Sequence, residues 1–188
     1  MQVRYQGQDY DWHETLWVML HKPRGYECSH NPMHNAGVFD LLPWHWIRRG
    51  VQAAGRLDSD SSGLLLFSDD GHWIHKIISP KHQIAKRYLV TLKHTAEMNF
   101  LQTLEEGVVL NGEQEPVRAL QGERLDDTHI RFSITEGKYH QVRRMVAAAG
   151  NRVEELHRIS VGPLELGELE EGQWRLLTEQ EALKVIEQ

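Results

Sequence analysis

Several features that mark other protein classes are scarce or absent in this chain of 188 residues. Cys28 is the only cysteine, which excludes an intramolecular disulfide and favours a reducing, cytoplasmic location. No apolar run approaches the length needed to span a bilayer, and the first residues lack the basic and apolar regions of a secretory signal. There is no glycine-rich phosphate loop and no dinucleotide fingerprint. The chain as a whole is 40% hydrophobic and 26% charged, which is an ordinary globular composition.

The chain also has fewer positively than negatively charged residues. A net charge of −6 argues at first against a nucleic-acid partner, but phosphate binding depends on local charge rather than on the total. Residues 165–188 hold seven Glu against two basic residues, whereas residues 131–164 are rich in basic side chains, namely Arg131, Lys138, Arg143, Arg144, Arg152 and Arg158. This segregation is compatible with a basic face, although most such runs are simply solvated surface.

The distribution of apolar residues predicts one domain. We expect residues 1–15 to be a lead-in or linker remnant and residues 16–188 to form the domain. Patterns typical of strands occur at 16–20, 64–67, 86–92, 130–135 and 153–161. Helical patterns occur at 72–78, 95–106 with Thr95 as cap, and 139–149, and Pro43 interrupts another. Thr178 with Glu181 predicts a capping box at the start of a last short helix. Strands outnumber helices without regular alternation, which predicts an α+β fold with a mixed, mostly antiparallel sheet and flanking helices.

One short segment has the pattern of a reactive loop. Residues 55–64 read Gly-Arg-Leu-Asp-Ser-Asp-Ser-Ser-Gly-Leu, so that Asp58 lies between two glycines and between two apolar stretches. Such a segment can hold a carboxylate on a rigid loop at a sheet edge. By itself the pattern is more typical of an ordinary turn in which Asp58 is a turn or cap residue.

The resemblance of this segment and several others to a known family favours the reactive loop over the ordinary turn. Residues 55–64 resemble the catalytic motif of the pseudouridine synthases, in the family named for the ribosomal small-subunit enzyme. Other segments match in the same order, from about residue 16 to residue 178: Lys22–Gly25, Lys86–Val90, Glu136–Met145, Gly150–Val153, Leu156–Arg158 and Val161–Gly162. The resemblance implies that family's catalytic fold, with a central RNA-binding cleft. Many members carry a small RNA-binding domain ahead of it, for which residues 1–15 leave no room.

The resemblance assigns roles to particular residues. Asp58 becomes the catalytic carboxylate, which attacks the anomeric carbon or takes a ribose proton, and Arg143 keeps it ionised. Tyr88 stacks on the flipped uracil and handles a proton at carbon 5. Each of the three also has an ordinary interpretation: Asp58 as a turn residue, Arg143 as a surface residue and Tyr88 as a core residue. We expect RNA contacts from Arg56, Lys22, Lys86, Lys138, Arg144 and Arg158, with Leu156 as a candidate pocket wall. No cofactor is needed.

Rival interpretations remain open at this point. The motif at Glu136–Met145 resembles the small-subunit enzyme most and favours 16S over 23S ribosomal RNA as substrate, free or in a precursor particle. We expect the protein to act as a monomer. An inactive RNA-binding module and a hydrolase are the alternatives, and Asp60 is the only nearby second acid for hydrolysis. Cys28, His30 and His34 have spacing similar to zinc ligands but lack the rest of a finger, so we expect a polar loop and no metal.

Overall fold

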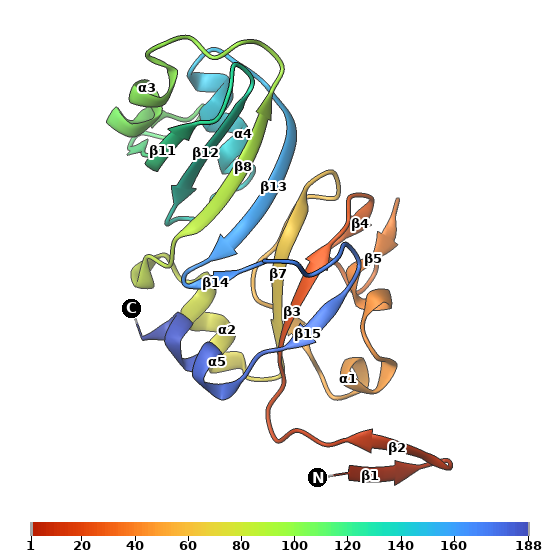
Figure 1. Cartoon of the computed structure of the whole chain (residues 1–188). Helices are drawn as coiled ribbons and strands as arrows, with labels where there is room; N and C mark the ends of the chain where they lie inside the picture. The colour runs from red at the N-terminus through yellow and green to blue at the C-terminus, as the bar shows by residue number, and fades with distance from the viewer. Residues whose placement is uncertain (1, 188) are drawn as a thin grey trace.

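A nine-stranded mixed sheet organises the chain in this computed structural model, which describes residues 2–187 (Figure 1). Its path runs β11–β12–β8–β13–β7–β3–β15, with β14 beside β13 and β6 beside β7. All neighbours are antiparallel except β13 and β7. The α+β expectation with a mostly antiparallel sheet is therefore confirmed. The strands are β3 Trp17–Lys22, β6 Gln52–Ala53, β7 Ser62–Ser68, β8 Lys86–Leu92, β11 Leu120–Arg124, β12 His129–Ile134, β13 Val153–Val161, β14 Leu164–Glu165 and β15 Trp174–Leu176.

The single parallel contact joins the two halves of the sheet. It consists of two paired positions, His157 with Ser62 and Arg158 with Gly63. Gly63 has a φ of +114°, and a Cβ built on it would lie 2.2 Å from the carbonyl oxygen of Arg158. Only glycine permits backbones to approach so closely in this conformation. The join lies directly after the loop that carries Asp58.

Strand β7 is buried on both faces, which explains its unbroken apolar run. Leu65 and Phe67 contribute to one buried cluster, and Leu64 and Leu66 contribute to the other. Helices α2 (Gly71–Ile78) and α5 (Glu179–Ile186) cover the second cluster, and lie side by side in Figure 1. The indole of Trp73 donates to the carbonyl of Ala182 at 2.7 Å and so ties the two helices together.

The larger cluster lies on the other face of the sheet and extends under α3 (Phe100–Glu106) and α4 (Gln141–Ala148). Strand β8 alternates buried and half-buried positions, so that Tyr88, Val90 and Leu92 face this cluster. The interrupted segment at Pro43 forms η1 (Val38–Leu41) and α1 (Trp44–Arg48), as its proline predicts. The remaining short elements are β4 Tyr26–Glu27, β5 Ala36–Gly37, η2 Pro80–His82, β9 Val108–Val109 and β10 Pro116–Val117.

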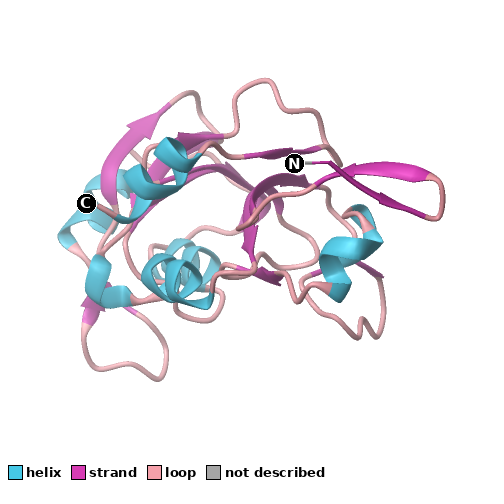
Figure 2. Ribbon diagram, turned by 90° about the horizontal axis from the view of Figure 1, so that it is seen from below, coloured by secondary structure: helices cyan, strands magenta, loops and turns pink. Residues whose placement is uncertain are grey.

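The N-terminal segment forms a hairpin that its sequence did not predict. Strands β1 (Gln2–Tyr5) and β2 (Gln8–Asp11) pair antiparallel and project from the rest of the chain (Figures 1 and 2). Gln6 and Gly7 both have positive φ, as in a type I′ turn, but glutamine is an uncommon residue there. Arg49 anchors the base of the hairpin, since it stacks over Trp12 at 4.8 Å and pairs with Asp69 at 2.6 Å.

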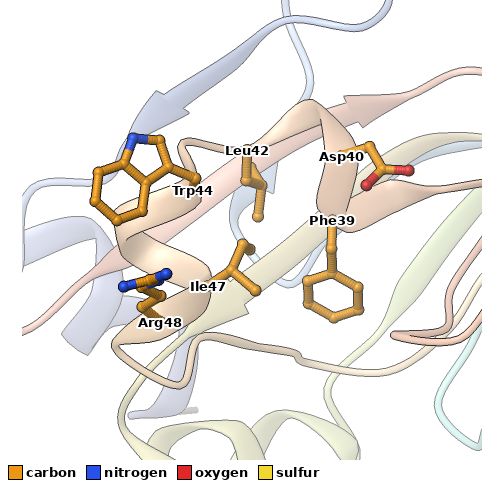
Figure 3. A pocket seen from close by; sticks show the side chains of 6 residues that line it. All are labelled: Phe39, Asp40, Leu42, Trp44, Ile47 and Arg48. Carbon is orange, nitrogen blue, oxygen red and sulfur yellow. The ribbon is translucent and has the colours of Figure 1, made fainter.

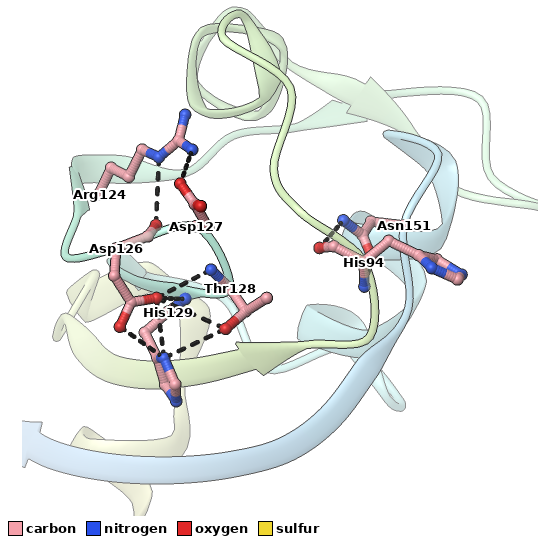
Figure 4. Close-up of polar contacts among 7 residues, drawn as sticks. All are labelled: His94, Arg124, Asp126, Asp127, Thr128, His129 and Asn151. Atoms are coloured by element: carbon pink, nitrogen blue, oxygen red, sulfur yellow. Dashed lines mark hydrogen bonds and ion pairs between the residues drawn. The ribbon is translucent and has the colours of Figure 1, made fainter.

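Helix α3 is shorter than expected, because it begins at Phe100 rather than after Thr95. The amide of Ala96 donates to the carbonyl of Asp127 at 2.7 Å, which draws residues 95–99 onto the β11–β12 turn instead. Figure 4 shows this turn, where Asp126 accepts from the amides of Thr128 and His129. These bonds, those of Thr128 first, lower the pKa of Asp126 to about 2. Tertiary contact therefore overrides a local helical pattern.

A second polar link in Figure 4 joins the end of β8 to the start of β13. Asn151 donates its side-chain amide to the carbonyl of His94 at 2.9 Å and accepts from the His94 amide at 3.2 Å. The asparagine follows the glycine that ends α4, so this link holds the α4–β13 connection against the sheet. Within residues 2–187, no helix has both the length and the apolar character needed to cross a membrane.

Candidate active site

The loop of residues 54–61 connects β6 to β7, and a buried lysine holds it in place. Lys22, at the end of β3, is 0% exposed. Its ammonium donates to the carbonyl oxygens of Ser61 at 2.7 Å, Pro23 at 2.9 Å and Asp58 at 3.1 Å. Burial is the largest influence on Lys22 and lowers its pKa. A buried cation surrounded by carbonyl oxygens fixes the backbone of the loop rather than meeting solvent.

The carboxylate of Asp58 remains accessible above this support. Its side chain is 34% exposed, and one oxygen lies 3.1 Å from Nε2 of His140. The other oxygen lies 3.7 Å from Nε of Arg143. Both partners come from the start of α4, which is far along the chain from the loop. Two nitrogen-bearing groups on separate oxygens fix the orientation of the carboxylate.

Arg143 links the two acids of the loop. Its Nη2 lies 2.9 Å from a carboxylate oxygen of Asp60 and donates to Oγ of Ser61 at 3.4 Å. Its Nε is buried and makes no hydrogen bond within the described chain, and it is the atom nearest Asp58. Asp60 thus faces the site, but its contact is with the guanidinium. This position gives Asp60 the role of orienting Arg143.

Tyr88 lies in the apolar wall near the loop. It is 7% exposed on β8 and belongs to the same buried cluster as Leu57, the residue before Asp58. Leu156 and Val142, which precedes Arg143, belong to that cluster too. The cluster therefore connects the three motifs that carry Asp58, Tyr88 and Arg143.

The basic residues expected to contact RNA differ in their exposure. Three of them are buried, namely Lys22, Lys86 and Arg158. This burial revises the expectation for Lys22 and Arg158, because their charged atoms bond to backbone carbonyls; Nε of Arg158 donates to Leu64 at 2.8 Å. Lys86 lies two residues before Tyr88 on the same strand face, and burial, reinforced by the charge of Arg158, lowers its pKa to about 8.

The other basic residues are closer to solvent. Lys138 pairs with Glu113 at 2.6 Å, and Arg144 approaches the same carboxylate at 3.5 Å. Arg56 is exposed and makes no ion pair within the part of the chain that the structure describes. Of the predicted contacts, Arg56 is the one best placed to meet a phosphate without breaking an existing pair.

The polar loop around Cys28 has structural contacts of its own. The thiol accepts from the amide of Leu57 at 3.4 Å, and burial raises its pKa. His30 stacks on Phe39 at 3.7 Å. Glu27 accepts from the amides of Met33, His34 and Asn35, the first of these most strongly, which lowers its pKa to about 2. Among the described residues no group of three or more His, Cys, Asp or Glu could hold a metal ion.

A hollow of about 470 Å³ lies beside η1 and α1 (Figure 3). Its floor is apolar and its rim carries one acid and one base, with the lining Phe39, Asp40, Leu42, Trp44, Ile47 and Arg48. The residues around Asp58 are not part of this lining. This hollow therefore lies apart from the loop that carries Asp58.

His140 is the site residue that sequence reasoning missed. It lies three residues before Arg143 and begins α4 in a left-handed conformation, with φ 49° and ψ 34°. The expected helix at 139–149 consequently begins only at Gln141. A histidine in an apolar-periodic helix is normally a surface residue, so its spacing gave no signal. The turn that departs from helical geometry is what directs its imidazole to Asp58.

Comparison with known proteins assigns this combination of sheet, loop and carboxylate to a class. Residues 16–148 match the family model described as RNA pseudouridylate synthase. The chain therefore belongs to the RNA pseudouridylate synthase family, as the ordered motifs predicted. The match spans β3 to the end of α4 and so includes Asp58, Tyr88 and Arg143.

Two curated proteins are similar to this chain over most of its length. The ribosomal small subunit pseudouridine synthase A of Haemophilus influenzae is 43% identical over 174 residues, which are 92% of this chain and 75% of that protein. The protein of the same name from Escherichia coli K12 is 41% identical over 177 residues, which are 93% of this chain and 75% of that protein.

Solved structures agree with the fold. A crystal structure described as a pseudouridylate synthase has a TM-score of 0.86 at 43% identity, covering 92% of this chain and 74% of that one. An archaeal box H/ACA sRNP Nop10–Cbf5 complex has a TM-score of 0.56 at 20% identity, covering 82% of this chain and 50% of that one, and shares the fold alone.

Proposed function

We propose that this protein converts a uridine of 16S ribosomal RNA to pseudouridine, with Asp58 as the catalytic carboxylate. The observation that carries the proposal is the placement of that carboxylate. It is accessible on a loop fixed by Lys22 and lies between His140 and Arg143. The names of the similar proteins refer to the small ribosomal subunit, which supports 16S rather than 23S RNA as substrate.

The reaction requires an anionic group beside the sugar and no external reagent. The bond between C1′ and N1 of the uracil breaks, the base turns over, and a bond forms between C1′ and C5. The proton on C5 leaves and N1 gains one, so atoms and electrons balance. Asp58 serves by attacking C1′ or by removing a ribose proton, and Arg143 orients its carboxylate in either case.

The surroundings suit a base that has left its stack. Flipping a nucleotide costs a few kcal/mol, which contacts in the pocket must offset. Tyr88 is proposed to stack on the uracil and to handle the proton at C5, with Leu156 as a further wall. Arg56, exposed two residues before Asp58, is proposed to contact phosphate.

The wider setting follows from this activity. Lys138 and Arg144 are proposed to meet the RNA backbone at the rim of the site, and Lys86 to contact the flipped nucleotide from below. We further propose that the protein acts as a monomer in the cytoplasm, on ribosomal RNA either free or within a precursor particle.

Tritium release from RNA labelled at C5 of uracil tests the proposal. Wild-type protein should release tritium from 16S fragments in preference to 23S fragments. Asp58→Asn should abolish release while RNA binding stays within about tenfold, since a catalytic group need not carry affinity. Asp127→Asn makes the same chemical change in the exposed β11–β12 turn and should keep full activity.

Each other outcome has a defined meaning. Turnover by Asp58→Asn would remove the catalytic role from this residue. Free uracil among the products would identify a hydrolase, and binding without release would identify an inactive RNA-binding module. Preference for 23S fragments would reassign the substrate within the family.

A further inference from the structure

An exposed aromatic pair lies beside the candidate catalytic carboxylate. The ring of Tyr139 stacks on the imidazole of His140 with centroids 3.9 Å apart and planes inclined by 16°. His140 in turn contacts Asp58 at 3.1 Å. Tyr139 is 78% exposed, so its ring meets His140 on one side and solvent on the other. The pair extends from the reacting carboxylate out to the surface.

Several hydrogen bonds hold this pair in a defined position. His140 adopts a left-handed conformation, which costs a residue other than glycine on the order of 1 kcal/mol. Gln141 accepts from the amide of Lys138 at 3.0 Å, and Arg144 donates to the carbonyl of Tyr139 at 3.1 Å. The backbone on both sides of the pair is therefore fixed. A rigid exposed ring loses little conformational entropy when a ligand stacks on it.

Cationic side chains lie close to the ring. Lys138 precedes Tyr139 and pairs with Glu113, and Arg144 shares the same carboxylate. Two cations therefore share one anion here, while the carboxylate of Asp58 is paired with His140 and Arg143. Aromatic rings combined with nearby cations are the usual means by which proteins bind unpaired nucleotides.

We propose that Tyr139 and His140 form a stacking platform for an unpaired RNA base next to the flipped uridine. The inference rests on the proposed function and specifies part of its substrate. His140 contacts the carboxylate that acts on the target ribose, and Tyr139 lies one ring layer, 3.9 Å, further out. Successive nucleotides of a strand rise by about 3.4 Å, so a base on the outer face of Tyr139 belongs to a neighbouring nucleotide.

The platform predicts a preference for single-stranded RNA around the target. A base paired in a duplex presents only its edge, whereas an unpaired base can place its face on the tyrosine ring. Stacking tolerates different bases, so the site selects an unpaired neighbour rather than a particular nucleobase. This is a structural criterion for choosing a uridine, separate from the pocket that holds the uracil.

Three variants and three RNA substrates test the platform. The substrates are a 16S fragment and the same fragment with an abasic residue beside the target uridine, made once for each side. Tyr139→Phe should keep kcat/KM within about twofold, since the ring remains. Tyr139→Leu should lose about fivefold or more on the intact RNA, which corresponds to about 1 kcal/mol, the lower end of a base–aromatic contact.

The control is Tyr10→Leu, which makes the same change in the β2 hairpin, at the opposite end of the chain in Figure 1. It should leave kcat/KM unchanged. For the wild-type protein, one of the two abasic RNAs should have a kcat/KM lower than that of the intact RNA by a similar factor. For Tyr139→Leu, the same abasic RNA and the intact RNA should have equal kcat/KM. Additive losses on both abasic RNAs would overturn the platform, because the ring would then only support His140. Equal rates for wild type and Tyr139→Leu would overturn it too.

Binding measurements separate this proposal from the proposed function. If the wild-type protein made no pseudouridine from any of these RNAs, the proposed function would fail. The Kd of intact and abasic RNA for wild type and Tyr139→Leu would still test the platform, with the same non-additive pattern expected. A tyrosine that instead docks another protein would leave all these RNA affinities unchanged, which would refute the inference.

Discussion

Replacing Gly63 by alanine should disrupt both the sheet and the loop that carries Asp58. Gly63 stands where β7 meets β13, at one of only two paired positions of the parallel contact. Its φ is +114°, and an added Cβ would lie 2.2 Å from the carbonyl oxygen, 2.5 Å from the nitrogen and 2.9 Å from the carbonyl carbon of Arg158. All three atoms are backbone, so no side-chain rotation can relieve the overlap.

Two costs combine in this substitution. The conformation alone costs a residue other than glycine about 1–3 kcal/mol. Relief of the overlap requires β7 and β13 to separate, which breaks the parallel pairing and displaces buried side chains such as Leu64. A loss of at least about 3 kcal/mol in the free energy of unfolding is expected, a large part of the stability of an ordinary domain.

Urea unfolding followed by tryptophan fluorescence measures this loss. Gly71→Ala is the matched control, since Gly71 begins α2 without positive φ and a Cβ there meets nothing within 4 Å. That variant should be neutral or more stable by up to about 1 kcal/mol. If Gly63→Ala unfolded within about 1 kcal/mol of wild type and kept full activity, the close approach of the strands would be refuted.

Other substitutions test the supports of the site. Lys22→Met should leave loop carbonyls unpaired, lowering the free energy of unfolding by about 3 kcal/mol and kcat with it; an unchanged urea midpoint would contradict this. Because the pKa of Lys86 falls from 10.5 to about 8 on folding, the native state binds fewer protons between these values. The stability of wild type relative to Lys86→Met should therefore rise over that pH range, by on the order of 3 kcal/mol, in parallel urea titrations, and a flat difference would refute the shift. Arg49→Met should speed proteolysis of residues 1–14, and equal cleavage rates would show that another contact anchors the hairpin.

Local pattern was sufficient for most elements of the fold. The run Leu64–Phe67 and the alternation of Lys86–Leu92 correctly predict β7 and β8. Thr178 with Glu181 forms the predicted capping box of α5. These features depend on neighbouring residues, which sequence spacing reports directly. The start of α3 and the N-terminal hairpin depend on a distant carbonyl and an uncommon turn residue, and both were missed.

The sequence by itself also determined the family and the position of Asp58, because the motifs that carry them are contiguous and ordered. Only the tertiary structure decided the surroundings of the carboxylate. It buries Lys22 beneath the loop, places Arg143 between Asp58 and Asp60, and directs His140 to the site. The physical reason is that burial and ion pairing depend on distances across the sheet, which residue type and spacing along a chain do not specify.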